Sequence, residues 1–332
     1  MTINPSAIAK IFMPRQLKEI DRIRNKNIRF AHYTSAENGL VILCTQSILL
    51  RNSSLMNDFS EMRYGWECLK LAYNGPLGNR LKTLLKTVQA DLPEIFEENF
   101  NSQYNSVENE TYLTSISEHA VSKNYKYEDQ FGRLSMWRAY APRNGVAFII
   151  NNKAFTSDTT ALSAYSIPVA YRTYKEFERD FDEVISSMEN NTEILKELGG
   201  KRVHDILSVA LKFAVQSTKH PSFNEEREWR IIYSPPTHHS PATVNVNQLN
   251  RVTSEILTIK GIPQRVYRIP FVDYPSEGLT GLTIPDLIDL VLIGPSLDSY
   301  AIRDAYVNKL KELNVVNPES KVIITGIPLR HS

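Results

Sequence analysis

The chain has 332 residues, with 38 Lys and Arg against 37 Asp and Glu, for a net charge of +1. This balance gives no global field that would draw the protein onto nucleic acid or anionic lipid. No window approaches the roughly 18 consecutive apolar residues of a membrane span, and the N-terminus lacks the apolar core of a secretory signal. We therefore expect a cytoplasmic protein without a membrane partner. The two cysteines are too few for a disulfide framework and are expected to be buried free thiols.

The first third of the chain alternates helical and extended patterns. Ser35 is expected to cap a helix, because apolar residues follow it at helical spacing. The break at Gly75-Pro76 divides a long helical stretch. The expected elements are a helix up to 27, a strand over 28–33, a helix over 36–43, a strand over 47–51 and helices over about 60–101.

The rest of the chain predicts most of a sheet. A second helical stretch covers about 175–220, with a break at Gly199-Gly200, and a helical turn is expected over 134–141. The expected strands are 112–117, 145–150, 167–171, 226–233, 254–259, 265–271, 287–293 and 321–325, with a helix over 298–313. This order indicates an α/β protein of the α+β type, with helical insertions at about 60–101 and 175–220 in one domain covering 1–332.

Two polar motifs lie in the first part of the chain. His32, Tyr33 and Thr34 end the first expected strand, where a strand-to-helix junction commonly exposes side chains to a ligand. A histidine there can donate to a ribose hydroxyl, or its ring can simply pack with its nitrogens satisfied. Asn57 and Asp58 form a turn that opens a helix, and helix capping alone also accounts for them.

A third motif places Trp137, Arg138 and Tyr140 within one helical turn. Two aromatic faces and a guanidinium suit the stacking of a base and the pairing of a phosphate. A Trp and a Tyr three residues apart are equally ordinary in a hydrophobic core. The motif therefore predicts either a nucleotide contact or core packing.

The fourth motif is the most specific of the four. Alternation over 226–233 predicts a strand with Glu226, Glu228 and Arg230 on one face. In a cleft, repulsion between the two glutamates would raise at least one pKa, while Arg230 would hold the other carboxylate ionised. Such a face suits proton transfer or stabilisation of a cation. A surface strand with charge-paired glutamates is the structural alternative.

Several enzyme classes lack their usual motifs in this chain. There is no GxGxxG, GxxxxGK[ST], HExxH or GxSxG, which argues against dinucleotide-fold oxidoreductases, P-loop NTPases, zincins and serine hydrolases. His238 and His239 lie in a proline-rich stretch without acidic neighbours, so we expect an exposed loop there. No resident metal is predicted.

Taken together, the motifs resemble those of a bacterial family of domains of unknown function. That family is recognised by a His-Tyr-Thr start, an Asn-Asp-x-x-Glu turn, a Met-Trp-Arg-x-Tyr-Ala segment and a Glu-x-Glu-Trp-Arg strand. All four occur here in order, at 32–35, 57–61, 136–141 and 226–231, and the ending at 320–330 is similar too.

The early HYT strand and the late Glu-x-Glu strand also resemble ADP-ribosyltransferases. This resemblance implies a mixed, mostly antiparallel central sheet, with NAD as a substrate. It further implies that Glu228 is the catalytic glutamate, which grips the nicotinamide ribose, and that Glu226 is the upstream acid. In those enzymes an early His or Arg binds NAD and a middle Ser, Thr or Tyr motif supports the nicotinamide side.

By the same resemblance, His32 would hold the adenosine ribose with help from Tyr33 or Thr34, and Trp137 and Tyr140 would take the stacking role. All four motifs are expected to converge on one cleft. Because Gln keeps the shape of Glu, Glu228→Gln is expected to remove activity while leaving the fold intact. The predicted NAD-binding residues are His32, Tyr33, Thr34, Asn57, Asp58, Trp137, Arg138, Tyr140 and Arg230.

Three functions stay open at this point. The first is an NAD-dependent ADP-ribosyltransferase-like protein, acting as a toxin or phage-defence effector on a protein or nucleic-acid acceptor. The second is a non-enzymatic module that binds a nucleotide or a protein. The third is a metal-dependent nuclease with Asp58, Glu61, Glu226 and Glu228 around magnesium.

Overall fold

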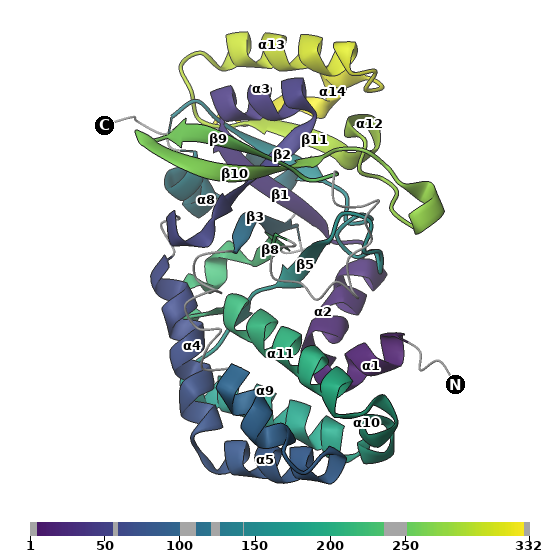
Figure 1. Cartoon of the computed structure of the whole chain (residues 1–332). Helices are drawn as coiled ribbons and strands as arrows, with labels where there is room; N and C mark the ends of the chain where they lie inside the picture. The colour runs from purple at the N-terminus through teal and green to yellow at the C-terminus, as the bar shows by residue number, and fades with distance from the viewer. Residues whose placement is uncertain are drawn as a thin grey trace. The chain divides into compact units, whose positions relative to one another are not determined.

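The computed structural model describes residues 5–55, 59–99, 111–120, 127–141, 143–235 and 251–328. The chain forms two compact units, each built from three segments. One unit, here the helical unit, takes 1–21, 52–111 and 167–224, and the other, the sheet unit, takes 22–51, 112–166 and 225–332. Figure 1 shows both.

The sheet unit is built on a ten-stranded mixed sheet, and every strand pairing that the register defines is antiparallel except that of β11 with β12. The expectation of a mixed α/β protein with a mostly antiparallel sheet is therefore confirmed. The main path runs β12-β11-β4-β1-β3-β2-β10-β9, and β8 pairs with both β3 and β5. The strands are β1 (Arg29–Ser35), β2 (Ser47–Asn52), β3 (Tyr112–His119), β4 (Gly145–Ile150), β5 (Ala164–Pro168), β8 (Glu228–Tyr233), β9 (Thr253–Ile259), β10 (Ile262–Pro270), β11 (Ile288–Ile293) and β12 (Val322–Ile324).

The centre of the sheet follows from its apolar sequence. β4, with the sequence GVAFII, is buried along its whole length and lies between β1 and β11. An unbroken apolar run of this kind is typical of a strand covered on both faces. This strand is therefore a fixed support for β1, which carries the first polar motif.

On one face of the sheet, β1 leads directly into α3 (Ala36–Thr45). Ser35 caps this helix, with its hydroxyl accepting from the Asn38 amide at 3.2 Å. Gly39 allows α3 to approach closely, because a Cβ there would lie 2.2 Å from the Tyr306 hydroxyl of α13 (Ser299–Glu312). The expected cap and helix are confirmed, and Figure 1 shows α3 and α13 stacked on the same side of the sheet.

A cluster of apolar side chains covers the other face of β1 and β4. It is formed by Ala31, Tyr33, Met136, Trp137, Ala141, Ala147, Ile149 and Leu292. Met136 and Trp137 belong to α8 (Leu134–Tyr140), which follows the short helix α7 (Glu128–Phe131). This apolar contact fixes α8 against the strand that carries His32. Two further short helices of the unit are α12 (Ile284–Leu287) and α14 (Pro318–Lys321).

The helical unit has a core of its own. Its members include Trp66, Leu69, Leu85, Phe181 and Leu207, drawn from the helices of both expected insertions. A capping box at Thr173 and Glu176 starts α9. The helices are α1 (Pro5–Phe12), α2 (Pro14–Asn25), α4 (Phe59–Tyr73), α5 (Pro76–Val88), one over 92–99, α9 (Tyr174–Glu189), α10 (Thr192–Leu198) and α11 (Gly200–Gln216). Of these, α2 continues into the sheet unit. The short strands β6 (Ala170–Tyr171) and β7 (Thr218–Lys219) pair in parallel.

Two sequence expectations are wrong. The strand expected over 226–233 begins at Glu228, because 221–226 form a 3-10 helix. Cys44 is exposed, whereas Cys68 is buried and both are free thiols. The breaks at Gly75-Pro76 and Gly199-Gly200 are confirmed, since α5 and α11 begin there.

The organisation of the chain as one domain stays a prediction, as does the cytoplasmic location. In the part of the chain that the structure describes, none of the helices has the length and apolar character needed to cross a bilayer.

Candidate functional site

The site begins where β1 separates from β3. The two strands pair through Arg29–His119, Phe30–Glu118 and Ala31–Ser117, and the pairing ends there. On its other edge β1 stays paired with β4 up to Ser35. His32 is therefore the first residue of β1 beyond the ladder with β3, and its ring can reach the backbone of β3.

The His32 ring contacts the next part of β3. Its Nδ1 lies 3.1 Å from the carbonyl oxygen of Ser115. A carbonyl can only accept, so Nδ1 carries the proton and Nε2 presents a lone pair. Burial lowers the pKa of His32, against the opposing effect of the bond to Ser115. The ring is therefore a neutral imidazole whose Nε2 can accept a hydrogen bond but cannot donate one, unlike the donor expected from the sequence.

The Ser115 side chain contacts the predicted catalytic glutamate. Its hydroxyl donates to Glu228 Oε1 at 2.5 Å. Arg230 donates from Nε to the same oxygen at 2.9 Å and from Nη2 to Oε2 at 3.2 Å. The Glu228 and Arg230 side chains are 5% and 3% exposed, so this is a buried ion pair. One serine thus connects His32 on β1 with Glu228 on β8.

Glu226 does not share a strand face with Glu228. It ends a 3-10 helix, and the next residue, Arg227, has a left-handed backbone with φ of +46°. The Tyr140 hydroxyl donates to Glu226 Oε1 at 3.0 Å. The sequence prediction of two glutamates side by side is therefore wrong, because alternation assumes extended backbone at every position.

Two of the predicted NAD-binding aromatic residues belong to the core. Trp137 is fully buried and packs edge-on against Tyr33, with ring centroids 4.8 Å apart. Its indole NH donates to the Phe131 carbonyl at 2.7 Å, and the Tyr33 hydroxyl accepts from the Arg133 amide at 2.9 Å. The predicted stacking of a base on Trp137 is therefore wrong, because its ring faces are covered by the core. The predicted help from the Tyr33 hydroxyl in holding a ribose is wrong as well, because this hydroxyl bonds the Arg133 amide.

The other predicted positions have different surroundings. Arg138 is exposed on α8, and Thr34 is half-buried in the β1 ladder opposite Val146. Asn57 and Asp58 lie outside the described residues. Within the sheet unit, Ser115 joins His32 to Glu228, and Tyr140 contacts Glu226; convergence of all four motifs on one cleft stays a prediction.

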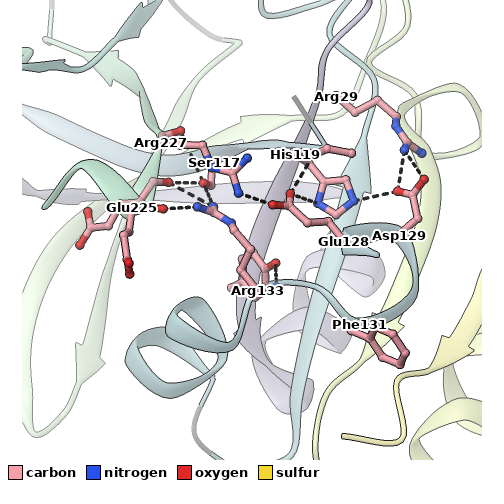
Figure 2. A network of polar contacts seen from close by, with 12 residues as sticks. Arg29, Ser117, His119, Glu128, Asp129, Phe131, Arg133, Glu225 and Arg227 are labelled. Atoms are coloured by element: carbon pink, nitrogen blue, oxygen red, sulfur yellow. Dashed lines mark hydrogen bonds and ion pairs between the residues drawn. The ribbon is translucent and has the colours of Figure 1, made fainter. Parts of the chain in front are cut away.

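A polar network lies beside this site, and Figure 2 shows it. His119 is fully buried, and its Nε2 lies 2.8 Å from Asp129, which Arg29 also holds at 2.6 Å. Glu128 lies 3.8 Å from Nδ1 of the same ring and pairs with Arg227. The two carboxylates favour the charged ring, but burial is the larger effect and lowers the pKa of His119. This histidine is therefore neutral near pH 7.

Sequence reasoning missed Ser115, Ser117 and Arg133. The sequence signal for the serines was present, because the strand YLTSIS carries Ser-x-Ser with both side chains on one face. Arg133 had no such signal. It is one of many arginines, and its importance depends on which oxygens the fold brings to it.

Comparison with known protein families matches part of the chain to a family of unknown function. A family model described as "Protein of unknown function (DUF2971)" matches residues 136–231, a span that begins at the Met-Trp-Arg motif and ends at the Glu-Trp-Arg strand. This supports the expected resemblance to a domain family of unknown function. No curated protein matches the chain, and no solved structure does.

Proposed function

We propose that this chain is an NAD-dependent ADP-ribosyltransferase-like protein whose site lies in the sheet unit. The observation that carries the proposal is the double contact of Ser115, with His32 at 3.1 Å and Glu228 at 2.5 Å. The order of these residues along the chain, an early His, a middle Ser and a late Glu, agrees with the resemblance, which has an early His or Arg, a middle Ser, Thr or Tyr motif and a late Glu. The likeness of the sheet to that of ADP-ribosyltransferases is part of the same proposal.

The chemistry requires an anion at one place. When the bond between C1′ of the ribose and the nicotinamide nitrogen breaks, the electron pair leaves with neutral nicotinamide and C1′ becomes oxocarbenium-like. An acceptor oxygen or nitrogen then bonds to C1′ and loses its proton; with water as acceptor the reaction is hydrolysis. A preorganised carboxylate stabilises the cation as it develops. Glu228 supplies this charge, and Arg230 keeps it ionised.

His32 has a binding role in this proposal. Its Nε2 lone pair accepts from a ribose hydroxyl, a contact that is the same in the ground state and the transition state. His32→Ala is therefore expected to raise KM and leave kcat nearly unchanged, whereas Glu228→Gln acts mainly on kcat.

The test measures NAD affinity by calorimetry and nicotinamide release by chromatography. We expect Glu228→Gln to lower kcat by about 10²-fold or more, as loss of other preorganised groups does. The matched control is Glu225→Gln, the same chemical change on an exposed side chain three positions away. Absence of NAD binding by the wild type, or full activity of Glu228→Gln, would refute the proposal.

The proposed setting is that of a toxin or phage-defence effector. Induced expression in a bacterial host should arrest growth with the wild type and with Glu225→Gln, but not with Glu228→Gln. Normal growth with all three would remove the toxin assignment while leaving the enzymatic assay to decide the activity.

A non-enzymatic nucleotide-binding module is the second candidate. The observation in its favour is that the charge of Glu228 is already compensated by Arg230 within a buried pair. Binding of NAD without nicotinamide release by the wild type would select this function.

A further inference from the structure

A single side chain holds the segment that leads into Glu228. The Arg133 guanidinium donates from Nη1 to the Glu225 carbonyl and from Nη2 to the Glu226 carbonyl at 3.2 Å. The same Nη2 also donates to the Ser117 hydroxyl on β3. Figure 2 shows Arg133 between Glu225 and Ser117. One guanidinium therefore gathers three oxygens from two separate parts of the sheet unit.

The segment that it holds has an unfavourable backbone. Arg227 is left-handed, with φ of +46°, a conformation that costs a non-glycine residue about 1–2 kcal/mol. Such a residue persists where its surroundings over-determine it. Here the Arg227 side chain pairs with Glu128, and the Arg227 carbonyl accepts from the Glu118 amide at 2.8 Å. Arg133 holds the carbonyls of the two residues before Arg227.

This conformation determines where the two glutamates point. An extended residue at 227 would put both carboxylates on one face of β8. With Arg227 left-handed, Glu226 reaches Tyr140 on α8 while Glu228 reaches Ser115 and Arg230.

We propose that Arg133 is a positioning residue of the candidate site, which holds 225–227 in the turn that separates Glu226 from Glu228. The inference rests on the proposed function for its catalytic consequence, but not for its structural one. Lysine cannot replace arginine here, because an ammonium is a compact point charge and lacks the planar fork that reaches three oxygens. The cationic charge alone is therefore insufficient.

The backbone itself provides the first test. Hydrogen exchange measured by mass spectrometry should show peptides covering 225–228 exchanging about tenfold faster in Arg133→Ala, with the β4 and β11 peptides unchanged. Ser117→Ala removes one of the three oxygens and should give a smaller change in the same direction. Arg143→Ala is the control, an exposed arginine soon after α8. Unchanged exchange at 225–228, or equal acceleration throughout the sheet unit, would overturn the proposal.

Kinetics provide the second test. In Arg133→Ala we expect kcat for nicotinamide release to fall about tenfold with KM changed less than about threefold, and Arg133→Lys to recover only a minor part. Wild-type kcat in an Arg133→Ala protein with loosened 225–228 would reject the positioning role. A wild type that neither binds nor cleaves NAD would reject the proposed function instead, and the exchange experiment would still decide whether Arg133 holds the turn.

Discussion

Replacing Glu228 by Gln removes one charge from an ion pair that is almost wholly buried. The Arg230 side chain is 3% exposed, so its guanidinium would lose this carboxylate and stay out of water. Removing one partner of a buried pair costs about 3–5 kcal/mol. Gln retains an acceptor for Ser115 and for Arg230 Nε, but its amide nitrogen replaces the acceptor of the 3.2 Å bond. We therefore expect a loss at the lower end, about 3 kcal/mol.

We therefore expect Glu228→Gln to keep the fold, as the sequence predicts, but with this loss of stability. The free energy of unfolding can be measured by urea denaturation followed by tryptophan fluorescence, because Trp137 and Trp229 are fully buried in the sheet unit. Glu225→Gln should lie within about 0.5 kcal/mol of the wild type, as exposed substitutions usually do. Activity of Glu228→Gln should accordingly be measured well below its unfolding temperature.

A double-mutant cycle separates the ion pair from general packing. Arg230→Met removes the buried cation and keeps an unbranched apolar chain, so adding it to Glu228→Gln should recover part of the lost stability. We expect a coupling energy of about 2 kcal/mol, within the range of residues in direct contact. A Glu228→Gln loss under about 1 kcal/mol, or additivity within about 0.5 kcal/mol, would refute this account of the pair.

Two further predictions concern the core and pH. Trp137→Ala should lower the free energy of unfolding by about 3–5 kcal/mol in urea denaturation, because the indole is fully buried against Tyr33. Tyr140→Phe, at an exposed position, should lower it little. A small loss for Trp137→Ala would contradict the assignment of Trp137 to the core. Burial lowers the pKa of both His32 and His119 in the folded protein. Each histidine therefore contributes stability that is fully present above its unfolded pKa of about 6.5 and is lost as pH falls toward the folded pKa. The Tm should accordingly drop between about pH 7.5 and 5.5, and less steeply in His32→Gln. A Tm that does not change with pH over this range would contradict the direction of these shifts.

Local sequence determined most of the elements. The unbroken apolar run of β4, the Ser35 cap and the Gly-Pro and Gly-Gly breaks each depend on neighbours within a few residues, and all appear where the pattern predicts them. The polar motifs were also found from the sequence alone. His32, Tyr140, Glu226 and Glu228 take part in the contacts that define the site.

Only the tertiary structure decided how those motifs are used. Trp137 and Tyr140 lie on the same helix turn, yet β1 and β4 bury the first and leave the second 40% exposed. Glu226 and Glu228 alternate in sequence, but the left-handed Arg227 sends them in different directions. That conformation is held by groups from α7, from β3 and from Arg133, which precedes α8, all far away along the chain. A periodicity rule cannot include such contacts, because they exist only once the strands have paired.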